Sequence, residues 1–217
     1  MDQWIIFGFG NFLSDVFDNI HSNDGRIKAI IGNLIYDETQ IGDLKRRVSL
    51  LDYDIPIRDL KTFHPQNGEK YFFGFRKERC GFINGLKKAY NLELSNLIHP
   101  TSYLGSNIQK GNGIYIGPHS TLAPNCRIND YCIINRASSI GHDTILGECA
   151  SVMPGAAIGG LVTIGKNTTV GIGATIIDRI NIGSNSFVGA GSVVIRDVPD
   201  NVIVVGTPAR VLREIPQ

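Results

Sequence analysis

The chain has 217 residues, which is enough for one large domain or two small ones. Its 21 Lys and Arg residues nearly balance its 20 Asp and Glu residues, so the formal charge of +1 attracts neither nucleic acid nor an acidic membrane over long range. The four cysteines show no C-x-x-C spacing, so the sequence indicates neither a zinc site nor a redox pair, and we expect no bound metal.

The first residues predict the start of a βα unit. The apolar run at 4–9 is too short to cross a membrane and follows an acidic start, so we expect neither a membrane span nor a signal peptide, and we place the protein in the cytoplasm. The stretch WIIFGFGNFLSDVFDNI reads as a buried strand, a turn at Gly8-Phe9-Gly10 and an amphipathic helix. Such a turn can hold a phosphate or a sugar at the N-terminus of the helix.

Further strands are expected at residues 28–36 and 69–75, with a helix near 81–90. Together with the first βα unit they predict a small Rossmann-like α/β domain over residues 1–97. The stretch NLIHPTSYLG then leads into a second domain over residues 98–217.

A repeat of six residues organises this second domain. From Leu104 to Val194, fifteen of the sixteen positions spaced by six are aliphatic, and Lys110 is the exception. The residue three places after these anchors is Gly or Asn at eight positions, namely Asn107, Gly113, Asn125, Gly155, Asn167, Gly173, Asn185 and Gly191. Gly and Asn tolerate a positive φ, so each hexad is a short strand plus a corner. The repeat predicts a parallel β-helix with three hexads, or 18 residues, in each coil.

The stretch SSIGHDTILGEC interrupts the small and aliphatic pattern with His142 and Asp143. His142 is two residues past its anchor Ile140, so it falls at a corner that points away from the core. One coil later the same corner is Gly160, preceded by Gly159, so no side chain lies above the imidazole. A histidine oriented by a carboxylate is suited to general base catalysis. The alternative is an exposed corner histidine followed by an aspartate that only forms the turn.

The hexads and the ending VPDNVIVVGTPARVLR, which carries a V-x-G-x-P-A pattern, resemble the hexapeptide-repeat acyltransferases. The order of a Rossmann-like domain and a β-helix is similar to the sugar acetyltransferases of that family, which modify nucleotide-linked amino sugars or sialic acid. The resemblance implies a left-handed β-helix, acetyl-CoA as the acyl donor, His142 as general base and Asp143 as its acidic partner. The flat faces of the prism, and a His142 corner too shallow to bury a cofactor alone, predict a homotrimer. Many relatives carry a second histidine where this chain has Ser151.

The resemblance also assigns two binding regions. Its residues for coenzyme A are Gly159, Gly160, Lys166, Arg196 and Arg210, with the backbone amides of the two glycines as donors to the oxyanion. Its residues for the acceptor are Gly8, Gly10, Asn11, Phe12 and Asp37. In that subfamily the first turn usually reads G-x-G-G-H, and this chain has Asn11 and Phe12 in place of Gly-His.

The expected activity is acetylation of the amino group of a nucleotide-linked 4-amino-4,6-dideoxy sugar, in the biosynthesis of surface glycans. O-acetylation of a sialic-acid-like sugar and a non-catalytic β-helix module for assembly or binding remain as alternatives. A γ-class carbonic anhydrase uses the same prism but needs three metal-binding histidines. Near the coils the chain offers only His99, His119 and His142, with no pair a few residues apart.

Overall fold

The computed structural model describes residues 1–8, 10, 12–32, 55–75 and 79–216. The chain divides into two compact units, Met1–Ser95 and Asn96–Gln217. This division lies two residues before the one expected from the sequence. Among the described residues, no helix has the length and the apolar character that crossing a membrane requires.

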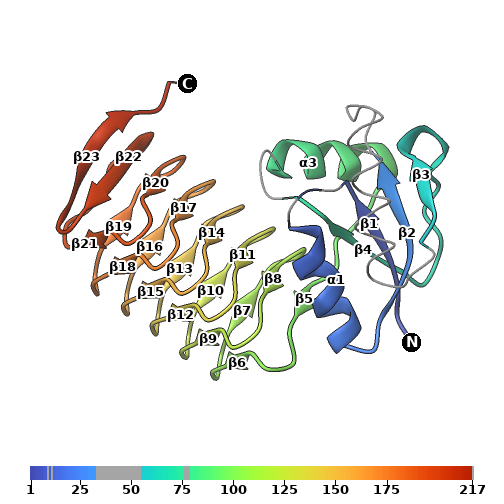
Figure 1. Cartoon of the computed structure of the whole chain (residues 1–217), viewed down its shortest axis with the longest axis horizontal. Helices are drawn as coiled ribbons and strands as arrows, with labels where there is room; N and C mark the ends of the chain where they lie inside the picture. The colour runs from blue at the N-terminus through green and yellow to red at the C-terminus, as the bar shows by residue number, and fades with distance from the viewer. Residues whose placement is uncertain (9, 11, 33–54, 76–78, 217) are drawn as a thin grey trace. The chain divides into compact units, whose positions relative to one another are not determined.

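The first unit contains a parallel four-stranded sheet in the order β3-β2-β1-β4 (Figure 1). Its elements are β1 (Gln3–Phe7), α1 (Leu13–Ser22), β2 (Arg26–Gly32), β3 (Ile57–Asp59), the 3-10 helix η1 (Leu60–Thr62), β4 (Glu69–Phe73) and α3 (Arg79–Tyr90). Residues Trp4 to Phe7 of β1 are all buried, as expected for a central strand of a parallel sheet that is covered on both faces.

The elements of this unit differ from the sequence prediction mainly at their ends. β2 begins two residues before the expected start, and the expected positions 33–36 lie outside the described residues. β4 ends at Phe73 rather than residue 75, and α3 begins at Arg79 rather than 81. β3 was not expected, because its three residues are half-buried or exposed and carry no apolar alternation.

The second unit is the predicted parallel β-helix, whose two-residue strands form three sheets. Sheet I contains β6 (Tyr103–Leu104), β9 (Thr121–Leu122), β12 (Ser139–Ile140), β15 (Ala157–Ile158), β18 (Thr175–Ile176) and β21 (Val193–Val194). Sheet II contains β7 (Gln109–Lys110), β10 (Arg127–Ile128), β13 (Ile145–Leu146), β16 (Thr163–Ile164) and β19 (Asn181–Ile182). Sheet III contains β5 (Leu97–Ile98), β8 (Tyr115–Ile116), β11 (Ile133–Ile134), β14 (Ser151–Val152), β17 (Thr169–Val170) and β20 (Phe187–Val188).

Within the coils, neighbouring strands of a sheet are 18 residues apart, as Ile140 and Ile158 are. Figure 1 shows the resulting stack from the green coils to the orange ones. β5 is already part of sheet III, so the coils begin before Leu104, where the sequence pattern first becomes regular.

The corners explain why glycine and asparagine recur in the sequence. All eight Gly and Asn corner residues predicted above have a positive φ. The same conformation occurs at the corners that carry other residues, namely His119, Tyr131, Ala137, Asp143, Cys149, Leu161 and Arg179. Every sixth residue from 107 to 191 is therefore left-handed, so the repeat itself imposes this conformation.

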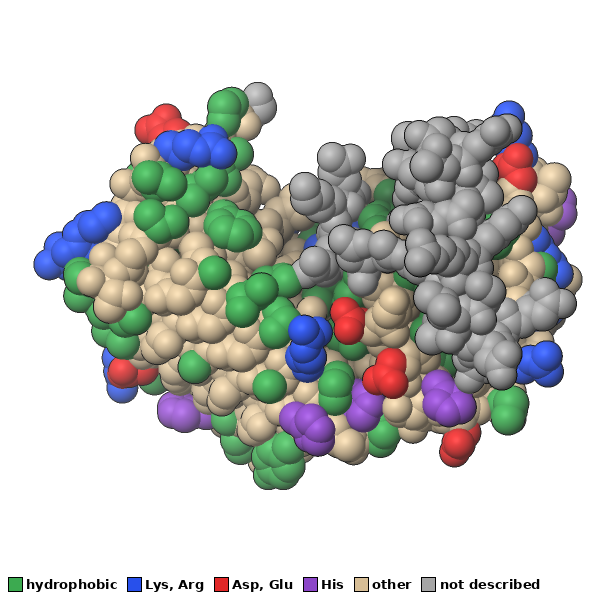
Figure 2. Space-filling view, in the orientation of Figure 1, with side chains coloured by type: hydrophobic (Ala, Val, Ile, Leu, Met, Phe, Trp, Pro, Cys, Tyr) green, Lys and Arg blue, Asp and Glu red, His purple; other side chains and the backbone are tan. Residues whose placement is uncertain are grey.

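A hairpin ends the β-helix. β22 (Val202–Gly206) extends sheet III beyond β20, and β23 (Ala209–Glu214) pairs with β22 in the antiparallel direction. β23 is the edge strand of this sheet, and its residues Val211 and Leu212 are both exposed. Figure 2 shows apolar and basic side chains gathered over this hairpin, which is at the left of Figure 1.

Candidate active site

His142 is held at a corner of the β-helix by the strands on either side. Ile140 of β12 and Leu146 of β13 point into the core, so the turn between sheets I and II must lie outside it. The φ of +56° at Asp143 closes this turn. The side chain of His142 is 59 % exposed, which confirms the outward direction expected from the repeat.

The imidazole of His142 is oriented by its neighbour. Its Nδ1 lies 2.7 Å from Oδ2 of Asp143. In the neutral ring the Nδ1–H donates to this carboxylate, which leaves the lone pair of Nε2 available to take a proton. Asp143 therefore closes the turn and also orients the ring.

The backbone of Gly160 lies directly against the imidazole. A Cβ placed on Gly160 would be 2.6 Å from Nε2 of His142, which is closer than nonbonded atoms can approach. The absence of a side chain at Gly160 is therefore what allows the observed ring position. A larger residue at position 160 would therefore displace the imidazole.

A column of turn residues continues from this corner along the prism. We call this column the His142 edge. It consists of the second residue after each strand of sheet I from β9 to β21: Pro124, His142, Gly160, Asp178 and Arg196. Arg196 is three coils beyond His142, which corresponds to roughly 14 Å at about 4.8 Å per coil.

Apolar and basic residues accompany this edge. Leu161, Ile177 and Ile195 are exposed beside it. Arg179 is exposed as well, and its Nε lies 3.6 Å from Oδ2 of Asp178. Arg179 was missed in the sequence analysis, although the 18-residue period places it next to the column.

Three other residues named from the sequence are not on this edge. Lys166 follows sheet II rather than sheet I, and its Nζ lies 2.5 Å from Oε2 of Glu148. Arg210 is on β23 of the terminal hairpin, where its Nη1 donates to the carbonyl of Ala209. Ser151 is a buried residue of β14 in sheet III, between Ile133 and Thr169.

Among solved structures, the chain is similar over nearly its whole length to two acetyltransferases and to a third protein, WeeI. The first is a mutant of perosamine N-acetyltransferase from Caulobacter crescentus in complex with CoA and GDP-perosamine, at 24% identity, a TM-score of 0.82, and coverage of 99% of this chain and 98% of that one. The second is the acetyltransferase domain of PglB from Neisseria gonorrhoeae, at 21% identity, a TM-score of 0.83, and coverage of 98% and 100%. The third is WeeI from Acinetobacter baumannii, at 22% identity, a TM-score of 0.81, and coverage of 98% and 100%.

The chain has the fold of these acetyltransferases. It is a left-handed parallel β-helix that follows a small Rossmann-like domain, as the resemblance implied. No protein-family profile and no curated protein matches the sequence.

The Rossmann-like unit carries the turn expected to meet the acceptor. Gly8 has a φ of +67°, and its N–H donates to the carbonyl of Ile31 at 2.8 Å. Gly10 is half-buried, whereas Phe12 is buried and stacks on Phe73 in the core. Of the expected acceptor residues, Gly8 and Gly10 thus form the turn, and Phe12 packs in the core. Asn11 and Asp37 lie outside the described residues.

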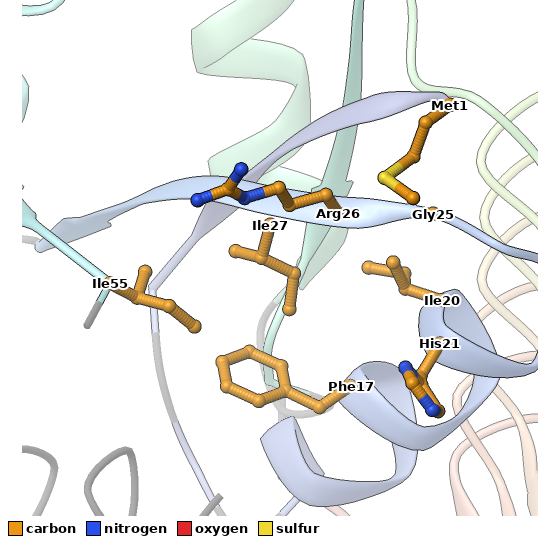
Figure 3. Close-up of a pocket in the computed structure, with 8 residues that line it drawn as sticks. All are labelled: Met1, Phe17, Ile20, His21, Gly25, Arg26, Ile27 and Ile55. Atoms are coloured by element: carbon orange, nitrogen blue, oxygen red, sulfur yellow. The ribbon is translucent and has the colours of Figure 1, made fainter. Parts of the chain in front are cut away.

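This unit also contains an apolar cavity of about 350 Å³ (Figure 3). Its lining residues are Met1, Phe17, Ile20, His21, Gly25, Arg26, Ile27 and Ile55. Most of them come from α1 and from the N-terminal ends of β1 and β2, and Ile55 precedes β3. Ligands of open parallel sheets bind at the C-terminal ends of the strands, which is where Gly8 lies. The cavity is therefore not at the expected acceptor turn.

The three histidines near the coils do not form a metal site among the described residues. Nδ1 of His99 lies 2.9 Å from Oγ1 of Thr101 and accepts the N–H of the same residue. His119 is a corner residue with positive φ, and His142 is paired with Asp143. This arrangement gives no support to the carbonic anhydrase alternative.

Proposed function

We propose that this protein transfers an acetyl group from acetyl-CoA to the amino group of a nucleotide-linked 4-amino-4,6-dideoxy sugar, in the biosynthesis of surface glycans. The observation that carries the proposal is the His142–Asp143 pair. Nε2 of His142 lies against the backbone of Gly160, which has no side chain. A fold shared with a perosamine N-acetyltransferase supports the same assignment.

The reaction follows from this geometry. The amine nitrogen of the acceptor attacks the carbonyl carbon of the thioester, and Nε2 of His142 takes a proton from the amine. Asp143 stabilises the imidazolium that results. The tetrahedral oxyanion accepts a hydrogen bond from the N–H of Gly160. When the intermediate collapses, the C–S bond breaks and the imidazolium gives its proton to the sulfur of coenzyme A.

We place acetyl-CoA along the His142 edge. The exposed Leu161, Ile177 and Ile195 offer an apolar surface for the pantetheine arm, and Arg179 and Arg196 offer cations for its phosphates. The perosamine N-acetyltransferase of similar fold binds CoA. Lys166 is dropped from this proposal, because it lies on another edge and is paired with Glu148.

We place the nucleotide sugar on the Rossmann-like unit, at the turn that contains Gly8 and Gly10. The turn lies at the C-terminal end of β1 and precedes the N-terminus of α1, whose partial positive charge favours a phosphate. The solved perosamine N-acetyltransferase holds GDP-perosamine, which is a nucleotide-linked sugar.

We propose further that three copies assemble, as expected for a prism with flat faces and a shallow corner at His142. The apolar residues along the His142 edge are exposed in one copy, and exposed apolar strips commonly mark interfaces or ligand sites. Analytical ultracentrifugation at micromolar concentration should show a trimer, and a stable monomer would contradict this part of the proposal.

The experiment that tests the activity is a screen of acceptors. UDP-, dTDP-, GDP- and CMP-linked sugars are mixed with acetyl-CoA and the purified protein, and a thiol reagent reports the free coenzyme A. We expect turnover with a nucleotide-linked 4-amino sugar. Turnover with only a sialic-acid-like sugar would favour O-acetylation, and release of no coenzyme A with any acceptor would favour the non-catalytic module.

A further inference from the structure

Thr144 is the first interior residue after the His142 corner, and it is fully buried. Its hydroxyl donates to the carbonyl of Gly159 at 3.1 Å. The same oxygen accepts the N–H of Val162 at 3.4 Å. Thr144 therefore links the two ends of the turn that contains Gly160, one coil above His142.

The hydrogen bond from Thr144 determines the direction of a second group. The carbonyl of Gly159 and the N–H of Gly160 belong to one planar trans peptide, so they point in opposite directions. The hydroxyl of Thr144 lies in the core and donates to the carbonyl of Gly159. The N–H of Gly160 is thereby directed outward, to the surface on which the imidazole of His142 lies.

This peptide needs such a constraint more than the others do. Gly159–Gly160 is the only Gly-Gly pair in the sequence, so its plane has little steric resistance to rotation. Both glycines are required, because a Cβ on Gly159 would lie 2.5 Å from the nitrogen of Asp178, and a Cβ on Gly160 would strike His142.

The turn after β15 also lacks a hydrogen bond that some other corners have. At those corners the N–H of the fourth residue donates to the carbonyl of the first, as Ala150 does to Gly147 at 3.0 Å and Ala174 does to Gly171 at 3.2 Å. In the turn after β15 the N–H of Val162 goes to Thr144 instead. Within the described part of the chain, the carbonyl of Gly159 accepts a hydrogen bond only from Thr144.

We infer that Thr144 is a positioning residue for acyl transfer: its hydroxyl holds the Gly159–Gly160 peptide so that the N–H of Gly160 donates to the oxyanion. The inference rests on the proposed function. Because Thr144 is buried, its side chain would act on the reaction without contacting acetyl-CoA or the acceptor sugar.

The chain contains a matched control. The hydroxyl of Thr168 donates to the carbonyl of Gly183 at 2.5 Å and accepts the N–H of Ser186 at 3.1 Å, as Thr144 does in its own turn. Gly183 follows β19 of sheet II, so this second turn lies on a different edge from His142. Thr168→Val removes the same two hydrogen bonds away from the proposed active site.

The experiment compares Thr144→Val, Thr144→Ser and Thr168→Val with the wild type. The substrates are acetyl-CoA and the nucleotide-linked 4-amino sugar that gives turnover in the acceptor screen. Thr144→Val should lower kcat by about 10–100-fold and change the KM for acetyl-CoA less than about threefold, since loss of a whole oxyanion donor costs about 10²–10³. Thr144→Ser keeps the hydroxyl and should restore most of kcat, and Thr168→Val should turn over like the wild type.

Two results would overturn the inference. One is a kcat of Thr144→Val within about threefold of the wild type, and the other is an equal loss in Thr168→Val. Misfolding does not obscure the comparison, because alanine or valine already occupies the equivalent interior position at Ala150, Ala156, Val162 and Ala174. The melting temperatures of the two valine variants should fall by similar amounts.

A crystal structure of Thr144→Val tests the same inference without any assay. We expect the Gly159–Gly160 peptide to be rotated or to occupy two orientations, and a single orientation equal to that of the wild type would overturn the inference. An inactive wild type in the acceptor screen would instead count against the proposed function. The two failures are therefore distinguishable.

Discussion

The two units of this chain achieve a buried core in different ways. In the β-helix each interior residue packs between its equivalents one coil below and one coil above, as Ile140 does between Leu122 and Ile158. In the Rossmann-like unit the contacts join residues that are far apart in the sequence and are not related by a repeat, as in the edge-to-face pair of Phe7 and Phe63, whose ring centroids are 5.1 Å apart. The environment of a residue can be obtained by counting in the β-helix, but not in the Rossmann-like unit.

The repeat also makes functional residues easier to recognise. In a repeat, each position requires a known type of residue. A residue of another type is therefore easy to recognise. His142 is such a residue, because an imidazole contributes nothing to a corner that only has to turn the chain. The Rossmann-like unit offers no comparable background against which to recognise its binding residues.

The largest expected effect comes from removing the residue that departs from the repeat. His142→Ala deletes the proposed base at an exposed corner and adds no bulk, so kcat should fall by roughly 10²–10⁴. The melting temperature and the calorimetric affinity for coenzyme A should change little. Wild-type turnover in this variant would refute the proposed mechanism.

A core residue of the repeat should instead affect stability. Ile140→Ala leaves a cavity between Leu122 and Ile158 and should lower the free energy of unfolding by about 2–5 kcal/mol. Ile145→Ala is the control, because Ile145 is on the next strand and its side chain faces outward. Thermal or denaturant unfolding compares the two variants, and equal losses would show that the interior positions are not the main source of stability.

A methyl group at the corner above His142 tests the contact that the structure revealed. Gly160→Ala places a carbon 2.6 Å from Nε2 of His142, so the imidazole must move, and kcat should fall by about 10–100-fold. Gly155→Asn is the control, since a Cβ there meets nothing within 4 Å and Asn occupies other corners of the same conformation. If Gly160→Ala keeps full activity, the ring position seen here is not the one used in the reaction.

The smallest expected effect concerns a polar contact of the Rossmann-like unit. Nζ of Lys28 lies 2.7 Å from Oε1 of Glu69, and the hydroxyl of Tyr71 donates to Oε2 of Glu69 at 2.9 Å. Burial acts to raise the pKa of Glu69, but the hydrogen bonds from Lys28, Tyr71 and the backbone of Gln66, together with the positive charge of Lys28, outweigh it, so the pKa is lowered. Burial, together with the nearby carboxylate, raises the pKa of Tyr71 to about 12, so the phenol remains a donor at neutral pH.

A carboxyl whose pKa is lowered in the folded state stabilises the fold above its unfolded pKa, and this stabilisation is lost as the pH falls through the folded value. Glu69→Gln should therefore cost about 1.5 kcal/mol at pH 7. The difference from the wild type should shrink as the pH falls below the ordinary value of 4.5. Denaturant titrations at pH 7 and pH 3 measure it. The exposed pair of Lys70 and Asp2 is the control, and Asp2→Asn should change stability much less.

In the candidate active site, too, counting residues along the repeat predicts some features and not others. The corner position of His142 followed from its distance to Ile140, and the bare corner above it followed from the 18-residue step to Gly160. The contact between the ring and Gly160 did not follow, because it depends on the rotamer that Asp143 selects. Lys166 was assigned by its charge, and its edge of the prism and its partner Glu148 became clear only in the structure.

The short strand β3 and the hairpin of β22 and β23 were missed for a related reason. β3 has three residues and no apolar alternation, so nothing local distinguishes it from a loop. β23 is exposed along most of its length and is held by its pairing with β22. Both are strands because of the partner beside them, and a partner is not a property of the segment itself.

By itself, the sequence determined the architecture of the second unit, because a period of six with aliphatic anchors can bury its apolar side chains in only one kind of coil. It determined, too, that His142 would face outward, since register in a repeat is set by counting. Only the tertiary structure decided what meets at that corner: Asp143 on one ring nitrogen, Gly160 against the other, and Thr144 behind the peptide of Gly160. These contacts join atoms one coil apart, and their geometry depends on backbone direction and rotamers that no single segment specifies.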